Sequence, residues 1–276
     1  MKMQVLLDNR IQDVDLETEN GLSIYLESQG QRWLLDTGKT DKFVKNADSL
    51  GIDIKEIDLV FISHGHSDHI GGLPTFLEMN TKAKVVVSEK ALTQKFFSTS
   101  NGLKSLGIDF DFSAYKDRFI YVDDFVDFGK GVFIVPCSND KYSTPKGNED
   151  IYKDGGFGFQ HDDFDHELAV CFGTTELLVY TGCAHNGIMN ILENVKSYTH
   201  LPVSCLIGGF HLIDSSDMKF FENIEELDEI SKAIKSEYPN AYLYTGHCTG
   251  NHAFKRLKMV LGPHLNAFYT GFSLEI

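Results

Sequence analysis

Ser63-His64-Gly65-His66-Ser67-Asp68-His69 is the stretch that decides the fold of this chain of 276 residues. It places three imidazoles and one carboxylate within six residues. The apolar run directly before it, 59–62, is typical of a buried β-strand, so we expect the histidines in a loop at the carboxyl end of that strand. Surface turns rarely concentrate so many borderline ligands without a metal ion. The stretch therefore predicts a metal site.

The spacing within the stretch indicates how its side chains share the metal. Alternate side chains of an extended segment point the same way, so we expect His64 and His66 to bind one ion. Asp68 and His69, where the backbone turns into an expected helix over 70–79, face a second ion. Imidazole and carboxylate ligands together suit zinc, iron or manganese. We expect two divalent ions, zinc foremost, with manganese or iron as the alternatives.

The composition excludes several classes of protein. The chain has 25 Lys and Arg residues against 40 Asp and Glu residues, a net charge of −15 with neutral histidines. Such a charge repels phosphate backbones and anionic bilayers, so neither nucleic acid nor membrane is an expected partner. No apolar run reaches the roughly 18 residues that a membrane span requires. A small anionic molecule bound at a metal is the expected substrate.

The organisation of the chain indicates a single domain over 1–276, since no repeat or linker divides it. The amino terminus lacks the basic and apolar regions of a secretory signal, which favours a cytoplasmic location. Five scattered cysteines without a C-x-x-C pair are expected to be reduced thiols, with one exception considered below. The sequence does not predict the oligomeric state.

The segment 138–165 differs from the rest of the chain. It is polar and rich in glycine, so we expect a long loop that acts as a lid. Lys141, Lys146 and Lys153 are its cluster of cations, which suits either contact with a phosphate or a solvated loop face.

Alternating apolar runs and amphipathic stretches predict mixed sheets with helices on the outside. The expected strands are 5–7, 22–27, 32–36, 59–62, 85–87, 132–135, 168–172, 177–180, 203–207 and 242–244. The expected helices are 41–50, 70–79, 90–97, 188–198, 220–236 and 253–261.

The H-x-H-x-D-H pattern of 64–69 resembles the motif of the metallo-β-lactamase superfamily, and the resemblance covers nearly the whole chain. Asp36-Thr37-Gly38 is similar to the D-x-G turn whose aspartate supports the metal loop in that family. The resemblance implies an α+β fold, the four-layer αββα sandwich. It also implies a dinuclear metal site along one edge of the two sheets.

The same resemblance implies further ligands at later strand ends. His247 matches the last ligand histidine of the family, and His185 is the expected third ligand of the first metal. Cys183 stands where most members have an aspartate that bridges the two metals, so it is either a ligand or part of the pocket wall. The usual third histidine has no clean match. His161, Asp163 and His166 are open alternatives for that position, as is a solvated acidic loop.

We assign the catalytic roles to Asp68 and His211. His211 lies at a strand end flanked by glycines, in the stretch Gly208-Gly209-Phe210-His211, which suits a hydrogen-bond donor or proton shuttle. A neutral core histidine is the alternative.

Several segments resemble a narrower branch, the dihydropterin–ribofuranosylaminobenzene phosphate synthase-like proteins. The expected function is a metal-dependent hydrolase that acts on a small phosphorylated metabolite. The alternative is a transferase that joins a pterin methyl diphosphate to an aminobenzene ribose phosphate. A di-iron redox enzyme and a non-catalytic metabolite sensor are further alternatives. The segments are Leu7-Asp8-Asn9, Glu19-Asn20-Gly21-Leu22-Ser23, Gly182-Cys183-Ala184-His185-Asn186-Gly187-Ile188, Gly208-Gly209-Phe210-His211-Leu212 and Gly246-His247-Cys248-Thr249-Gly250.

Overall fold

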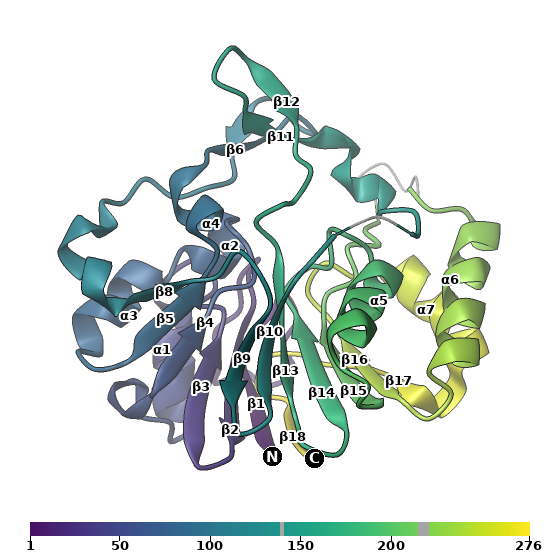
Figure 1. Cartoon of the computed structure of the whole chain (residues 1–276), viewed down its shortest axis with the longest axis horizontal. Helices are drawn as coiled ribbons and strands as arrows, with labels where there is room; N and C mark the ends of the chain where they lie inside the picture. Colours follow the sequence, from purple (N-terminus) through teal and green to yellow (C-terminus); the bar gives the residue numbers. More distant parts are fainter. Residues whose placement is uncertain (139–140, 215–220) are drawn as a thin grey trace. The chain divides into compact units, whose positions relative to one another are not determined.

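A computed structural model describes residues 1–138, 141–214 and 221–276 (Figure 1). The chain forms two compact units. The single domain expected over 1–276 stays a prediction, and the expected start of a helix at 220 lies outside the described residues. The first unit comprises Met1–Asp123, Ile151–Leu168 and Phe268–Ile276, and the second comprises Asp124–Asp150 and Ala169–Ala267.

The first unit is built on a seven-stranded mixed sheet. Its order is β18 (Ser273–Glu275), β1 (Lys2–Leu7), β2 (Ser23–Ser28), β3 (Gln31–Leu35), β4 (Leu59–Phe61), β5 (Lys84–Val87) and β8 (Phe119–Tyr121). The strands from β18 to β3 pair antiparallel, and those from β3 to β8 pair parallel. The early hairpin and the later buried strands therefore follow the pattern expected from the sequence.

The helices α1 (Lys42–Ser49) and α3 (Leu73–Met79) cover one face of this sheet (Figure 1). Phe43 on α1 and Phe76 on α3 are fully buried in a core with sheet residues such as Val60. Burying each large apolar side chain contributes roughly 1.5–3 kcal/mol, so this layer holds the helices to the sheet. The short 3-10 helices η1 (Ile54–Glu56) and η2 (Phe112–Arg118) border it.

The helix expected over 70–79 is interrupted at its start. The chain instead forms a short α2 (Ser67–Ile70), and α3 begins after Gly71 and Gly72. A Cβ at Gly72 would lie 2.3 Å from the carbonyl oxygen of Thr37, and one at Gly71 would lie 2.2 Å from that of Lys39. The two glycines thus allow the histidine segment to pack directly against the turn that follows β3.

A third sheet belongs to the first unit, and it corrects two expectations. Its strands are β12 (Phe159–His161), β11 (Ile151–Asp154), β6 (Phe96–Ser98) and β7 (Lys104–Ser105). The helix expected over 90–97 ends early, as α4 (Glu89–Thr93), because β6 pairs with β11 and Phe97 contacts Phe159 of β12 edge to face, with ring centroids 4.7 Å apart. The expected lid loop over 138–165 likewise contains η3 (Lys146–Asp150), β11 and β12.

The second unit is built on another seven-stranded sheet. It contains β17 (Leu265–Ala267), β16 (Tyr242–Thr245), β15 (Val203–Gly208), β14 (Leu177–Thr181), β13 (Leu168–Phe172), β10 (Val132–Pro136) and β9 (Val126–Gly129). β14, β15, β16 and β17 pair parallel, so their carboxyl ends meet at one edge. The loops after β14, β15 and β16 carry the later candidate ligands.

The helices α5 (Ile188–Tyr198), α6 (Ile224–Glu237) and α7 (Asn251–Leu261) pack on this second sheet (Figure 1). Ile191 of α5, Ile234 of α6 and Leu257 of α7 are buried in one core with the strands. α6 begins with a capping box, in which Asn223 and Glu226 exchange side-chain and backbone hydrogen bonds. A short 3-10 helix, η4 (Gly262–His264), follows α7.

The close packing at Gly72 yields a stability prediction. Gly72→Ala forces a methyl group against the Thr37 carbonyl, so we expect the free energy of unfolding to fall by about 1–3 kcal/mol. Urea denaturation of the metal-free protein measures it. Gly107→Ala is the matched control, because its Cβ would meet nothing nearer than 3.9 Å. Equal stability of the two variants would contradict the close approach.

Candidate metal centre

The Asp36 carboxylate holds the histidine segment in place. Asp36 lies at the end of β3, where its backbone has a positive φ of 57°. Its Oδ1 accepts a hydrogen bond from the backbone N–H of Ser63 at 2.7 Å, and its Oδ2 accepts one from the Ser63 hydroxyl at 2.7 Å. The same Oδ2 lies 2.7 Å from Nδ1 of His69. One buried carboxylate therefore fixes both ends of the segment.

These hydrogen bonds determine which ring nitrogen of each histidine carries the lone pair that a metal ion would need. A carboxylate only accepts, so Nδ1–H of His69 donates to Asp36, and the lone pair of His69 is on Nε2. The Ser63 hydroxyl gives its proton to Asp36, so it accepts from Nδ1 of His64 at 2.9 Å. His64 then also carries its lone pair on Nε2. This is the supporting arrangement typical of metal-binding histidines, and it fits a divalent ion.

The remaining residues of the segment gather around His64. The ring centroid of His64 lies 4.6 Å from that of His66 and 4.2 Å from that of His69. The carboxylate of Asp68 reaches 4.0 Å from Nε2 of His69. Burial, with the nearby His166 adding to it, lowers the pKa of His66 to about 3. His66 is therefore in the neutral form that binds a metal.

His166 is hydrogen-bonded through both of its ring nitrogens. Its Nδ1 accepts the backbone N–H of Gly65 at 3.2 Å, which leaves Nε2–H to donate to Asp162 at 3.1 Å. Burial raises the pKa of Asp162, but the hydrogen bonds that it accepts from His166 and from the backbone N–H of Phe164 hold it below its ordinary value. Although His66, Asp162 and His166 lie close enough to share an ion, both nitrogens of His166 are already engaged.

The other two alternatives for the missing histidine lie in different surroundings. Asp163 forms an ion pair with Lys153. His161, on the exposed strand β12, stacks on Tyr152 with ring centroids 4.5 Å apart. Neither is grouped with the histidine segment among the described residues.

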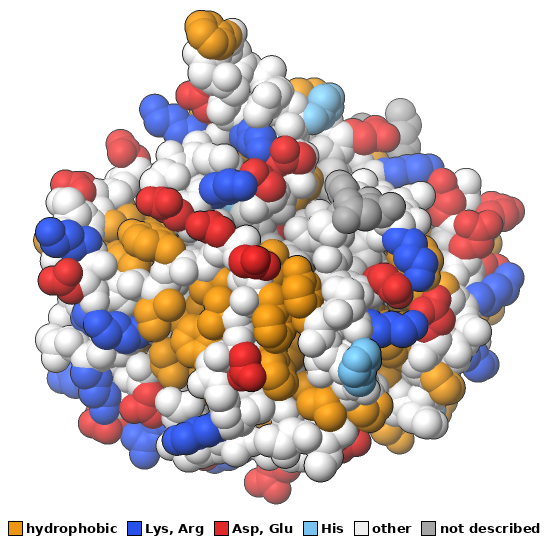
Figure 2. All heavy atoms as spheres, in the orientation of Figure 1, with side chains coloured by type: hydrophobic (Ala, Val, Ile, Leu, Met, Phe, Trp, Pro, Cys, Tyr) orange, Lys and Arg blue, Asp and Glu red, His pale blue; other side chains and the backbone are white. Residues whose placement is uncertain are grey.

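The lysines of 138–165 are paired with carboxylates. Lys141 lies 3.1 Å from Glu193, and Lys146 lies 2.6 Å from Glu226. Figure 2 shows the same intermixing of acidic and basic side chains over the face in view. These ion pairs favour the alternative of a solvated loop face over contact with a phosphate, which stays a prediction.

Cys183, two residues after the end of β14, is the centre of the candidate ligand set in the second unit. Its Sγ lies within 4.8 Å of a ring nitrogen of His185 and of His247. Nδ1 of His185 lies 2.9 Å from Oδ1 of Asn148, and the amide of Asn148 donates to the His185 carbonyl at 2.8 Å. Asn148 therefore orients His185 with its lone pair on Nε2, as Asp36 does for His69.

Strained backbone marks this edge of the second sheet. Ala184, His211 and His247 have positive φ values of 57°, 49° and 51°. Residues other than glycine rarely adopt this conformation, and it is concentrated at functional sites. His211 lies beside His185, with ring centroids 4.1 Å apart.

Cys248 is a member of this cluster that the sequence reasoning missed. Its Sγ lies within 4.8 Å of the Cys183 sulfur and of a His211 ring nitrogen. Burial raises the pKa of Cys248. Its hydrogen bonds with Cys183 and His211, together with the nearby His247, outweigh burial and bring this pKa well below its ordinary value. Cys248 directly follows the candidate ligand His247 in the sequence, and this position could have marked it as a further candidate.

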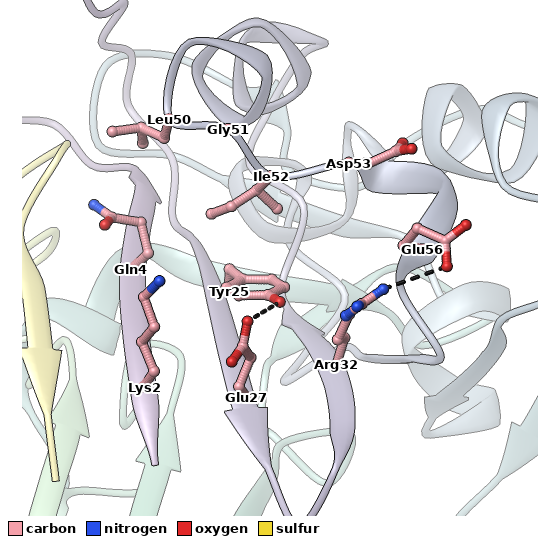
Figure 3. A pocket seen from close by; sticks show the side chains of 10 residues that line it. All are labelled: Lys2, Gln4, Tyr25, Glu27, Arg32, Leu50, Gly51, Ile52, Asp53 and Glu56. Atoms are coloured by element: carbon pink, nitrogen blue, oxygen red, sulfur yellow. Dashed lines mark hydrogen bonds and ion pairs between the residues drawn. The ribbon is translucent and has the colours of Figure 1, made fainter.

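The first unit also contains a separate pocket of about 270 Å³, which holds none of the predicted site residues (Figure 3). The Tyr25 hydroxyl donates to Glu27 at 2.6 Å, and Arg32 lies 3.3 Å from Glu56. Polar groups that line this pocket are therefore paired with one another. The lining residues are Lys2, Gln4, Tyr25, Glu27, Arg32, Leu50, Gly51, Ile52, Asp53 and Glu56.

Comparison with known proteins identifies the family. The model of the metallo-beta-lactamase superfamily matches residues 16–168, more than half of the chain. The crystal structure of Tm1679, described as a metal-dependent hydrolase of the beta-lactamase superfamily, is 32% identical with a TM-score of 0.83. That match covers 100% of this chain and 99% of Tm1679. The chain therefore belongs to the metallo-β-lactamase superfamily, which confirms the α+β sandwich fold expected from the sequence.

A curated relative supports the narrower resemblance. The 7,8-dihydropterin-6-methyl-4-(beta-D-ribofuranosyl)-aminobenzene-5'-phosphate synthase of Methanocaldococcus jannaschii is 27% identical over 248 residues, covering 84% of this chain and 82% of the relative. A diphosphatase from the PhnP family shares the fold, with 16% identity, a TM-score of 0.53 and coverage of 100% of this chain and 97% of the diphosphatase.

In the described part of the chain, no helix has the length and apolarity needed to span a bilayer.

The role of Asp36 yields a metal-binding prediction. An amide in place of the carboxylate cannot accept from all three donors, so we expect Asp36→Asn to weaken zinc binding about 10–100-fold. Competition with a chromophoric chelator measures the affinity. Asp58→Asn is the control, because Asp58 accepts only from the exposed backbone N–H of Arg32 among its described hydrogen bonds. Affinities within twofold of each other would refute the supporting role.

The assignment of His166 yields a second metal-binding prediction. We expect His166→Ala to leave the number of bound zinc ions unchanged and to lower their affinity about 10–100-fold, because the variant loses the supporting hydrogen bonds to Gly65 and Asp162 but no proposed ligand. Elemental analysis gives the number and chelator competition the affinity. His161→Ala should change neither quantity. The loss of one zinc ion from His166→Ala would show instead that His166 is a ligand.

Proposed function

We propose that this protein is a metal-dependent hydrolase that acts on a small phosphorylated metabolite. The observation that carries the proposal is the fixed orientation of three buried histidines, His64, His69 and His185, each with Nδ1 engaged and Nε2 as the ligand atom. Histidines supported in this way are typical of metal centres. The likeness to Tm1679, described as a metal-dependent hydrolase, supports the reaction class.

The proposal includes two divalent ions, with zinc foremost. Each unit carries its own set of candidate ligands. Borderline nitrogen ligands together with a thiolate favour zinc over manganese. The ligands are His64, His66, Asp68 and His69 from the first unit, and Cys183, His185 and His247 from the second.

The bound metal would supply an acidified water and polarise the ester oxygen of the substrate. Asp68 is the proposed catalytic carboxylate of the motif. Its side chain is 23% exposed, whereas that of His69 is fully buried, so Asp68 can reach both a ligand position and solvent. In the proposal, Asp68 accepts a hydrogen bond from the attacking water and orients it.

The substrate class follows from charge and from the relatives. A net charge of −15 disfavours long polyanions such as nucleic acids, whereas a small phosphate ester carries too little charge to be repelled strongly. The synthase of M. jannaschii has a 5'-phosphate in its printed name. A monophosphate or diphosphate of a small metabolite is therefore the proposed substrate.

A transferase is the second candidate, and the 27% identity with the named synthase favours it. Both reactions break a bond in a C–O–P linkage: hydrolysis transfers the phosphoryl group to water and releases the alcohol, whereas the transferase displaces diphosphate from carbon. They differ in the nucleophile, which is water in the hydrolase and a carbon atom of an aminobenzene ring in the transferase. The supporting roles of Asp36 and Asn148 would be the same in both.

Product analysis distinguishes the two reactions. We expect zinc-loaded protein to release phosphate from members of a panel of phosphorylated metabolites in the absence of any second substrate. His66→Ala and Asp68→Ala should each lose bound zinc and lower kcat/KM by about 10²-fold or more, since even an outer supporting residue contributes about 10–100-fold.

Lys39→Ala is the control for these variants, because its exposed side chain belongs to neither ligand set. Pyrophosphate released only when a pterin methyl diphosphate and an aminobenzene ribose phosphate are both present would establish the transferase. Zinc binding with no turnover of either kind would overturn both candidates.

A further inference from the structure

The edge of the second sheet carries two cysteines that approach each other from different loops. Cys183 follows β14, and Cys248 lies in the loop between β16 and α7. Their sulfur atoms and one ring nitrogen of His211 all lie within 4.8 Å of one another. These three groups come from three separate chain segments, so their meeting is a property of the fold.

Three backbone features hold Cys248 in this position. Its sulfur accepts the backbone N–H of His211 at 3.3 Å, and its thiol lies 3.6 Å from the carbonyl of Cys183, to which it donates. A Cβ on Gly209 would lie 2.3 Å from the Cys248 sulfur, so only glycine leaves room for it. A backbone N–H directed at sulfur is an interaction that supports a thiolate ligand.

We propose that Cys183, Cys248 and His211 bind a thiophilic divalent metal ion, zinc foremost. Tetrahedral zinc with ligand bonds of about 2.0–2.3 Å requires its donor atoms to lie roughly 3.5–3.8 Å apart. The two sulfur atoms and the ring nitrogen lie within 4.8 Å of one another, so small side-chain movements bring them to this spacing. Two thiolates and one imidazole leave a fourth position for water or substrate. Binding displaces the two thiol protons to solvent, and no electron is transferred.

The proposal shares only Cys183 with the proposed function, whose other ligands are the histidines and Asp68. It gives the second unit a preference for soft metals that the H-x-H-x-D-H segment lacks, because thiolates select zinc over manganese. It also makes His211 a metal ligand in place of the proton shuttle expected from the sequence. The strained backbone of His211, with its φ of 49°, directs the ring toward the two sulfurs.

Cobalt substitution tests this site directly. We expect Co²⁺ added to the reduced, metal-free full-length protein to produce a thiolate-to-cobalt charge-transfer band. Cys248→Ser should lose about half of its intensity, because one of the two thiolates is removed. Cys205→Ala is the matched control: Cys205 is buried in β15, where burial raises the pKa of its thiol to about 12, and it belongs to none of the described ligand groups.

A second measurement needs no variant. Zinc should protect Cys183 and Cys248 of the wild-type protein from alkylation, as followed by mass spectrometry of the modified peptides. Full band intensity in folded Cys248→Ser, or zinc-independent alkylation of Cys248, would overturn the proposal.

The same spectra separate this site from the proposed function. His66→Ala should retain the charge-transfer band while losing hydrolysis, because His66 is not a ligand of the thiolate site. A wild-type protein that shows the two-thiolate band and hydrolyses no phosphorylated metabolite would support the thiolate site and reject the proposed function. Hydrolysis by a wild-type protein whose cobalt form shows only a one-thiolate band, unchanged in Cys248→Ser, would do the reverse.

Discussion

The buried carboxylate of Asp36 is the constraint on which the first ligand set depends. It accepts three hydrogen bonds, from the backbone and hydroxyl of Ser63 and from Nδ1 of His69. A buried carboxylate without partners costs several kcal/mol, so the folded chain must provide these donors together. By doing so it also sets the tautomer of His69 and, through Ser63, that of His64. The same hydrogen bonds that stabilise the buried charge of Asp36 therefore also orient the rings of His64 and His69.

The second ligand set depends on strand direction. β14, β15 and β16 pair parallel, so the loops that follow them meet at one edge of the sheet. Cys183, His211 and Cys248 are distant in sequence, yet their ligand atoms lie within 4.8 Å. The strained backbone at Ala184, His211 and His247 is stabilised by the buried strands beneath it. Asn148 then fixes His185 from η3, within the segment expected to be a lid.

Hydrogen bonds and ion pairs already engage some side chains whose chemistry would suit a metal or a phosphate. His166 has the right chemistry, but a backbone N–H and Asp162 engage both of its nitrogens. Lys141, Lys146 and Lys153 are cations in a segment that the sequence linked to phosphate, and each is paired with a carboxylate. Residue type alone does not distinguish a ligand from its support, because the distinction lies in which atoms are already hydrogen-bonded.

The sequence by itself indicated the family, through the resemblance of its H-x-H-x-D-H segment, and it predicted the buried strands and helices such as α5, because local periodicity encodes them. It failed for β6, β11 and β12, whose short polar or mixed runs become strands only by pairing with one another. It also gave Cys248 no role and left His166 open as a ligand. Only the tertiary structure decided these strand pairings and the contacts of Cys248 and His166. A hydrogen bond or a sulfur contact between residues far apart in the chain produces no periodic pattern in the sequence of either segment.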